Sequence, residues 1–290
     1  MKSATPLFVR AALCLTLALH PADFSGFVAA QNMVASPPGA APALCYADIA
    51  DLSDAAPIVA QVRIRNIVPI KGEAAAGATG GRRRLFVEAD VTSLIRGESG
   101  IAPRVTYLYD APVGPRGKLP KLKKASVILF ARAAPRPGEL QLVAPDAQIA
   151  ATPERLAQVK AVQAALVAPG APPRILGVGD AFHVAGTIMG EGETQIFLRT
   201  QNGDPVSLSI LRRPGQEPRW AVALGEIVDE AARAPQPGTL LWYRLACSLP
   251  PTLPAQSVRA LAPRDAIAAQ EDYALVIAAL GPCSRTRDAA

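Results

Sequence analysis

The chain has 290 residues, 50% of them hydrophobic, and a formal net charge of +6 at neutral pH. This length is enough for one large domain or two ordinary ones. Aromatic residues make up only 5% of the sequence, which disfavours sites that stack nucleic-acid bases or sugars on aromatic rings.

The N-terminus has the pattern of a secretory signal peptide. Lys2 and Arg10 precede a short apolar run, residues 11–19, and residues 28–30 supply the small side chains that a signal peptidase reads. The apolar run is too short to cross a bilayer as a permanent helix. Residues 1–30 are therefore predicted to be a cleaved signal peptide, with a buried N-terminal helix as the alternative.

Cleavage is predicted between Ala30 and Gln31, which makes the mature protein periplasmic or secreted. Lipid anchoring at Cys14 is disfavoured because Leu13 stands where lipidation signals have a small residue. No later run is long enough to be a transmembrane helix. Residues 31–44 are rich in proline and alanine and are predicted to be a linker.

Three cysteines remain after the predicted cleavage, namely Cys45, Cys247 and Cys283. An odd number in an oxidising compartment leaves one thiol unpaired or in an intermolecular bond. We predict a Cys247–Cys283 disulfide and a free Cys45, because the first two both lie in the helical C-terminal region. The alternative is three buried thiols. No pair has CxxC spacing, which argues against a redox site or a zinc site.

Residues 45–150 are predicted to form a β-rich, barrel-like domain. After a short helix over 45–55, five segments alternate apolar and polar residues or are wholly apolar, as strands do. A Gly/Ala-rich loop over 72–81 and a basic, proline-broken loop over 111–124 separate some of them. The predicted strands are 58–68, 84–95, 104–109, 127–130 and 140–143.

Three of these segments resemble the strands of a known barrel family. They read Ala56–Val62, then Phe86–Val91 leading to Leu94–Gly97, then Val127–Phe130. Their order is similar to that of OB-fold barrels of the netrin and tissue metalloproteinase inhibitor type. This resemblance, over residues 45–145, implies a β-barrel that presents loops to a partner, and it carries over no functional residue.

Two basic clusters concentrate the positive charge, one at residues 82–84 and one at residues 116–124. Such clusters attract anionic surfaces, including phospholipid headgroups and lipopolysaccharide, although they are also common in solvated loops. Nucleic acid is disfavoured as a partner by the export signal and by the lack of interleaved aromatics. The candidate anion-binding residues are Arg82, Arg83, Arg84, Lys118, Lys121, Lys123 and Lys124.

A helix and a proline-rich connector, residues 151–173, are predicted to follow the barrel-like domain. Thr152 supplies an N-cap hydroxyl, Pro153 fits the first helical position, and Glu154 places an acid in the first turn. The proline and glycine residues after residue 167 end the helix and mark a domain boundary.

Residues 174–290 are predicted to form an α+β domain around a β-hairpin over 195–211. A two-residue Asn-Gly loop would place Leu198 opposite Ser207 and mix apolar with polar positions on one face. A loop of odd length avoids this mixture, so we predict a longer turn with Gly203 in the left-handed conformation.

Further elements of this domain are predicted on either side of the hairpin. A strand is expected around 181–185 and a third meander strand over 219–223. Helices are expected over 239–249, which is apolar on nearly all sides, and over 263–280.

His183 is the only histidine left after the predicted cleavage. It is the candidate catalytic base of a hydrolase, but no G-x-S-x-G or S-x-x-K motif supplies a nucleophile. Its neighbours Phe182 and Val184 are apolar and strand-like, which favours a structural histidine in a sheet.

No glycine or carboxylate group has the spacing of a phosphate, nucleotide or metal site. The glycine pairs at 177–179 and 190–192 are interpreted as turns. The sequence therefore predicts no metal and no cofactor. The acidic groups without a ligand pattern are Glu191, Glu193 and Asp204, and Glu226, Asp229 and Glu230.

Together these features predict an exported α+β protein, with an N-terminal barrel-like module followed by an antiparallel sheet packed with C-terminal helices. The leading hypothesis is a non-catalytic binding or interaction protein, whose partner is an envelope protein or an anionic surface. The alternatives are a hydrolase that uses His183 and a structural or assembly factor of the cell envelope.

Overall fold

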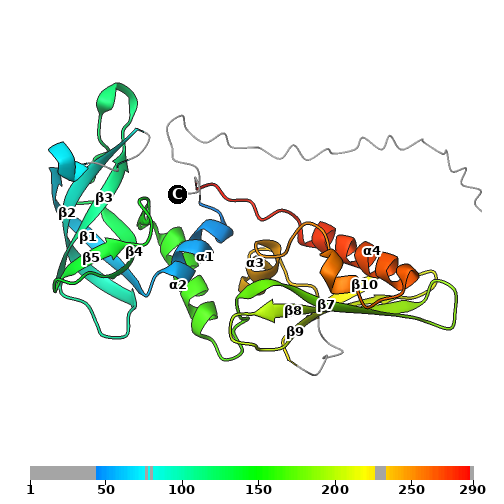
Figure 1. Cartoon of the computed structure of the whole chain (residues 1–290). Helices are drawn as coiled ribbons and strands as arrows, with labels where there is room; N and C mark the ends of the chain where they lie inside the picture. Colours follow the sequence, from blue (N-terminus) through cyan, green and yellow to red (C-terminus); the bar gives the residue numbers. More distant parts are fainter. Residues whose placement is uncertain (1–43, 76–77, 79–80, 226–232, 288–290) are drawn as a thin grey trace, which may run out of the picture. The chain divides into compact units, whose positions relative to one another are not determined.

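The computed structural model describes residues 44–75, 78, 81–225 and 233–287 (Figure 1). They form a closed five-stranded barrel, a separate four-stranded antiparallel sheet, and helices, so the predicted α+β fold class is confirmed. No helix in these ranges is long and apolar enough to cross a membrane. Outside the ranges lie the predicted signal peptide, the linker up to residue 43, and the acidic group Glu226, Asp229 and Glu230.

The barrel closes because its first strand pairs on both sides. β1 (Ile58–Pro69), β2 (Arg82–Arg96) and β3 (Arg104–Pro112) form an antiparallel meander. β5 (Glu139–Leu142) pairs in parallel with β3, and β4 (Ser126–Ala133) pairs with both β5 and β1. Register shifts between β1 and β2 are bulges, which bend a strand and help it to serve two neighbours.

Four of the five segments predicted as strands lie within strands of the barrel, and the fifth, 140–143, extends one residue past the end of β5. The sixth strand, β6 (Gln148–Ala150), pairs with β4 and was not predicted, because three residues show no alternation. β2 begins at Arg82 rather than at residue 84. The first basic cluster is therefore part of a strand and not a solvated loop. Two short 3-10 turns, η1 (Gly72–Ala75) and η2 (Pro115–Gly117), lie in the β1–β2 and β3–β4 connections.

Two helices enlarge the barrel core. α1 (Tyr46–Ala55) buries Ile49 and Leu52 against it, and α2 (Pro153–Val167) buries Val159. α2 begins where the sequence predicts, since the Thr152 hydroxyl accepts the backbone N–H of Arg155 at 3.3 Å.

The second sheet has the strand order β10-β9-β8-β7, with every pair antiparallel. Its strands are β7 (Ile175–Ala185), β8 (Gly192–Thr200), β9 (Val206–Arg212) and β10 (Arg219–Ala223). The sequence predicted this meander, but it predicted only the second half of β7.

The turn of the predicted hairpin is confirmed in its register and its backbone. Leu198 lies opposite Val206, so the loop has an odd number of residues. Gly203 has a φ of +81°, the left-handed conformation that glycine adopts without a steric penalty. Register, rather than the Asn-Gly dipeptide, therefore determines the turn.

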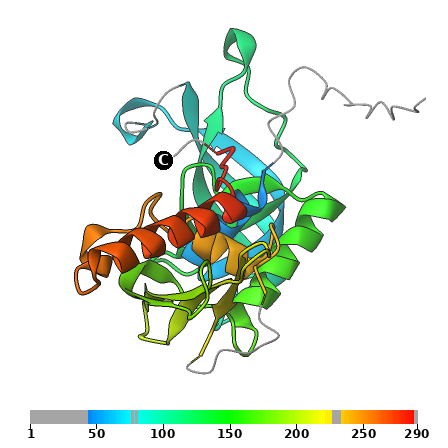
Figure 2. The same cartoon turned by 90° about the vertical axis from the view of Figure 1, so that its right-hand side faces the viewer.

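Helices cover one face of this sheet (Figure 2). They are α3 (Leu240–Ala246), the short η3 (Ala255–Val258) and α4 (Pro263–Leu280). α4 lies across the strands and buries Tyr273 and Val276 in the second core. The predicted helix that is apolar on nearly all sides is α3, which contributes residues to both cores.

The predicted Cys247–Cys283 disulfide is confirmed, with an S–S distance of 2.02 Å. It joins the end of α3 to the segment that follows α4. Cys45 is a free thiol, as predicted. Its Sγ lies 3.2 Å from Asp48 Oδ2 and 3.0 Å from the backbone oxygen of Ser284, two acceptors that share its single proton.

Three carboxylates on one face of α1 bind distant parts of the chain. We call Asp48, Asp51 and Asp54 the aspartate row. Asp48, which is fully buried, accepts the backbone N–H groups of Thr286 and Arg287 at 3.1 and 3.2 Å.

The other two members of the row bind α3 and its surroundings. Asp51 accepts the Tyr243 hydroxyl at 2.7 Å and Arg285 Nε at 2.6 Å. Asp54 pairs with Arg244 at 2.7 Å and with Arg174 at 2.7 Å. The row thus connects the barrel core to the polypeptide of the second sheet and to the C-terminal segment.

We expect this row to make stability fall at acidic pH. Burial alone would raise the pKa of Asp54, but hydrogen bonds and charge from Arg244 and Arg174 outweigh it and lower the pKa below the ordinary 3.8. Burial likewise opposes the pKa shift of Asp48, where hydrogen bonds from Thr286 and Cys45 again produce a lowered value. A carboxylate with a lowered folded-state pKa stabilises the fold above its unfolded value, and this contribution disappears as it becomes protonated.

The expected result is a free energy of unfolding that drops as the pH falls below 3.8, the unfolded value of these groups. Urea titrations above and below that pH measure the drop. An Asp54→Asn variant should show a smaller drop between the two conditions, because one of the linked protons is removed. An identical drop in the variant would contradict the assignment.

Candidate functional site

The end of the barrel that carries the β1–β2 and β3–β4 connections is strongly basic. The end of the β1–β2 connection lies beside the start of the β3–β4 connection, because the Val113 N–H donates to the oxygen of Gly81 at 2.8 Å. We call the exposed cationic side chains here the basic end. They are Arg83, Lys118, Lys121, Lys123 and Lys124.

The turn that carries the last lysines is fixed to the barrel. The Lys124 N–H donates to the oxygen of Ile64 at 2.9 Å, and the Ala125 N–H donates to the oxygen of Leu122 at 2.9 Å. Lys124 has a φ of +68°, which is uncommon for a residue other than glycine. This backbone holds Lys123 and Lys124 beside the middle of β1.

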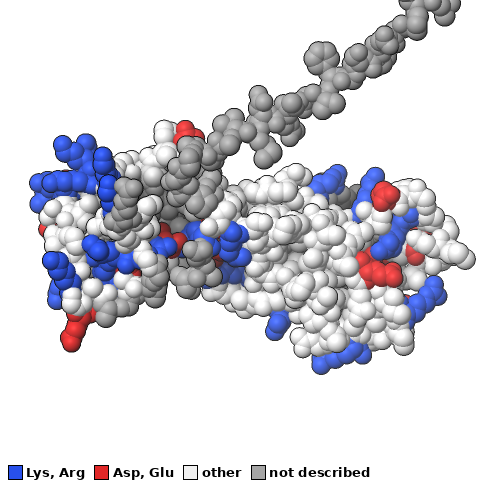
Figure 3. All heavy atoms as spheres, turned by 90° about the horizontal axis from the view of Figure 1, so that it is seen from above, with Lys and Arg blue, Asp and Glu red and all other residues white. Residues whose placement is uncertain are grey.

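The members of the basic end have no carboxylate within ion-pair distance among the described residues. Two other predicted residues differ. Arg84 makes a bidentate ion pair with Asp110 at 2.8 and 2.9 Å, and Arg82 donates to the Asp110 backbone oxygen at 3.2 Å. Lysine and arginine gather over the barrel in Figure 3, whereas most of the visible surface over the second sheet is uncharged.

His183 lies in a hydrogen-bonded chain that crosses the second sheet. Its Nδ1 is 2.8 Å from the Thr194 hydroxyl oxygen, and that hydroxyl donates to Asp272 on α4. Arg212 Nε donates to the other Asp272 oxygen at 2.5 Å. Because the Thr194 proton is directed to Asp272, its oxygen accepts the Nδ1–H of His183.

This series of hydrogen bonds is typical of a structural contact between secondary-structure elements. Thr194 is 0% exposed and Asp272 is 1% exposed, so a substrate has no access to the hydroxyl or the carboxylate. A Cβ added at Gly192 would lie 3.0 Å from His183 Cε1, which shows how closely the ring packs on β8. These hydrogen bonds connect α4 to the three strands β7, β8 and β9.

The acidic residues named in the sequence analysis, where they fall in the described ranges, do not gather into a group that could hold a metal ion. No group of three or more histidine, cysteine or carboxylate side chains there is arranged to hold a metal ion. Glu191, Glu193 and Asp204 fall within those ranges.

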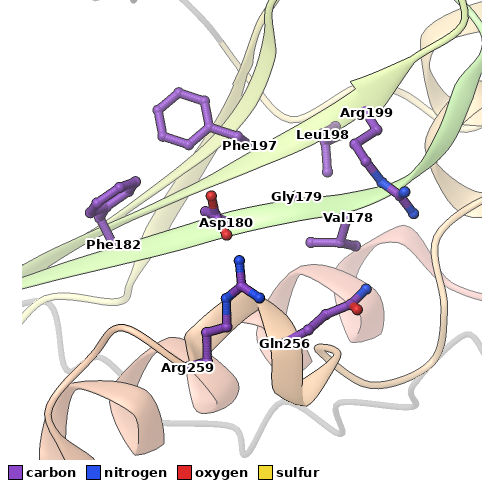
Figure 4. A pocket seen from close by; sticks show the side chains of 9 residues that line it. All are labelled: Val178, Gly179, Asp180, Phe182, Phe197, Leu198, Arg199, Gln256 and Arg259. Atoms are coloured by element: carbon purple, nitrogen blue, oxygen red, sulfur yellow. The ribbon is translucent and has the colours of Figure 1, made fainter.

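A pocket of about 500 Å³ lies beside β7, the edge strand of the second sheet (Figure 4). We call it the arginine pocket. Asp180 and Arg259 point toward each other across it, and Arg199 lies at one side. The rings of Phe182 and Phe197 meet edge to face, with centroids 5.8 Å apart.

The sequence did not predict this pocket. Alternation placed Phe197 and Arg199 on the outer face of β8, but Arg259 comes from the turn after η3, far along the chain. A second pocket, of about 590 Å³, lies on the barrel. Two of its charged residues, Arg84 and Asp110, are already paired with each other.

The sequence matches no known protein family, and no curated protein is significantly similar to it. The resemblance of the barrel to the netrin and metalloproteinase-inhibitor families therefore stays a prediction. The function has to be inferred from the chemistry of these surfaces.

Proposed function

We propose that the chain is an exported, non-catalytic binding protein that docks on an anionic surface of the cell envelope through its basic end. The observation that carries this proposal is the set of exposed cationic side chains at the basic end, for which the described part of the chain holds no carboxylate within ion-pair distance. Each lysine or arginine near a negatively charged lipid surface contributes about 1 kcal/mol of attraction.

Two further observations support export. The N-terminal sequence has the basic, apolar and small-residue regions of a signal peptide. The Cys247–Cys283 disulfide is typical of oxidising compartments outside the cytoplasm.

A non-catalytic role is supported by the surroundings of His183. Its Nδ1 is engaged by a buried threonine, whose own proton is donated to Asp272. A hydrolase that uses His183 would need a nucleophile that the described residues do not place there.

Reversing three lysine charges should abolish docking. The variant Lys121→Glu, Lys123→Glu, Lys124→Glu is expected to bind vesicles of anionic phosphatidylglycerol on the order of 100-fold more weakly, since each lost lysine removes about 1 kcal/mol. Co-sedimentation of the signal-free protein with anionic and with zwitterionic vesicles measures the affinity. Binding of the unmodified protein should weaken as salt is added, because salt screens exposed charges.

The matched control reverses three exposed cations elsewhere, as Lys160→Glu, Arg213→Glu, Arg264→Glu. It changes the net charge by the same amount and should retain most of the binding. Equal losses in both variants would mean that only net charge matters and would overturn the proposed site. If vesicles retain nothing and crosslinking captures a stable protein complex, the assembly role replaces the proposal.

A further inference from the structure

The geometry points to a second binding site, the arginine pocket, for a carboxylate that stands next to an apolar side chain, as at the C-terminus of a peptide. This site is separate from the basic end and does not depend on the proposed docking. It is argued from charge, apolar exposure, backbone shape and the free edge of β7.

The charges of the pocket favour an anion. Arg199 and Arg259 are both exposed, and neither has a carboxylate within ion-pair distance among the described residues. Among the described residues that line the pocket, two are arginines and one, Asp180, is an acid, and Arg259 points toward that acid while Arg199 lies at one side. A guanidinium binds a carboxylate through two parallel hydrogen bonds, as it also binds a phosphate, so the arginines select an oxyanion and the neighbouring features select its source.

The apolar part of the pocket favours a side chain beside that carboxylate. Phe182 is 53% exposed and Phe197 is 38% exposed, although both are large aromatic residues on a strand. An apolar ligand group placed against their rings would remove this surface from water, which is favourable. Asp180, between the rings and Arg259 in Figure 4, can accept an N–H from the ligand.

The backbone under the pocket is shaped by two glycines. Gly177 has a φ of +151°, and a Cβ there would lie 2.7 Å from Arg199 Nη2. The missing side chain lets the guanidinium lie directly against β7. A Cβ at Gly179 would lie 3.2 Å from the Phe197 oxygen, and a register shift between Val178 and Ala181 turns Asp180 out of the alternation.

The position of the pocket on an edge strand favours a peptide over a free small acid. β7 pairs only with β8 among the described strands, so its other edge keeps unpaired backbone N–H and C=O groups. An extended peptide can pair with such an edge while side-chain pockets select its residues. A peptide end would therefore add backbone hydrogen bonds to the arginine contacts.

The test measures the affinity of the full chain without its signal peptide for three probes, by calorimetry or by fluorescence anisotropy. The first probe is a short peptide that ends in phenylalanine with a free carboxylate. The second is the same peptide with a C-terminal amide, and the third is N-acetylphenylalanine. The free-acid peptide should bind at least tenfold more tightly than either of the others.

Variants separate the pocket from general effects. Arg259→Ala should lower the affinity for the free-acid peptide at least tenfold, to about the affinity for the amide peptide. The melting temperature should not change, because the Arg259 side chain is exposed. Arg213→Ala, an exposed arginine that does not line this pocket, should leave binding unchanged. Gly177→Ala should also weaken binding, because its Cβ would collide with the Arg199 guanidinium.

Several outcomes would overturn the inference. Equal affinity for the acid and amide peptides would remove the carboxylate from the recognition. Equal affinity for N-acetylphenylalanine and the peptide would replace the peptide end with a small acid. An unchanged affinity in Arg259→Ala, or no binding at millimolar peptide, would exclude the pocket altogether.

Discussion

Replacing Asp54 with alanine should lower the free energy of unfolding by about 3–5 kcal/mol, the usual cost of leaving a buried charge without its partner. Asp54 accepts two hydrogen bonds from Arg244, at 2.7 and 2.9 Å, and an ion pair from Arg174 at 2.7 Å. The Arg244 side chain is 8% exposed and that of Asp54 is 16% exposed. Water cannot readily replace the lost carboxylate there, so the Arg244 charge would be left poorly solvated. Urea unfolding followed by circular dichroism measures the change.

The chain offers a matched control on the surface of the barrel. Asp90 also pairs with two arginines, Arg65 at 3.3 Å and Arg104 at 3.2 Å. These side chains are 41–59% exposed, so Asp90→Ala should cost no more than about 1 kcal/mol. Equal losses in the two variants would show that burial does not set the strength of the Asp54 cluster.

The sequence predicted the strands, which show a repeating apolar pattern. It did not predict contacts between residues that are far apart in the sequence. Alternation located the barrel strands and the hairpin, because apolar burial acts on each strand separately. The aspartate row has helical spacing in α1, yet nothing in that spacing indicates its partners. Arg244 and Arg285 reach the row only after the chain has folded back on α1.

The same limit explains the arginine cluster at the start of β2. In the sequence alone, Arg82–Arg84 looks like one cationic patch that binds anions. In the strand, Arg84 stands opposite Asp110 in the register of β2 and β3 and pairs with it, while Arg83 is exposed. Alternation along a strand places neighbouring residues on opposite faces, but it does not show which residues of the next strand they contact. The pairing of β2 with β3 was therefore needed to distinguish the exposed arginine from the paired one.

The arginine pocket was hidden for a related reason. Asp180 leaves the alternation at a bulge, and bulges have only a weak signature in sequence. Arg259 follows a single 3-10 turn that carries no amphipathic pattern. Phe182 and Phe197 are exposed on outward strand positions, but the sequence alone did not identify them as part of a site.

Removing the Cys247–Cys283 disulfide should lower the free energy of unfolding by roughly 4 kcal/mol, according to chain-entropy arguments for a loop of this size. The two cysteines are 36 residues apart in sequence. The double variant Cys247→Ser, Cys283→Ser should therefore unfold at a clearly lower urea concentration. Cys45→Ser is the control, because a serine hydroxyl, like the thiol, has one proton to share between Asp48 and the Ser284 oxygen.

The location of the disulfide predicts which part of the protein its removal destabilises most. Cys283 stands directly before the residues that bind the aspartate row, and Arg287 also pairs with Asp146 at 2.5 Å. Without the disulfide, the C-terminal segment is still held to α1 by its contacts with the aspartate row and by the contact of Cys45 with the Ser284 oxygen. Amide hydrogen exchange at Arg285–Arg287 should then accelerate more than exchange in α4 or in the barrel strands. Uniform acceleration across the chain would instead assign the whole effect to the unfolded state, where the cross-link restricts the chain.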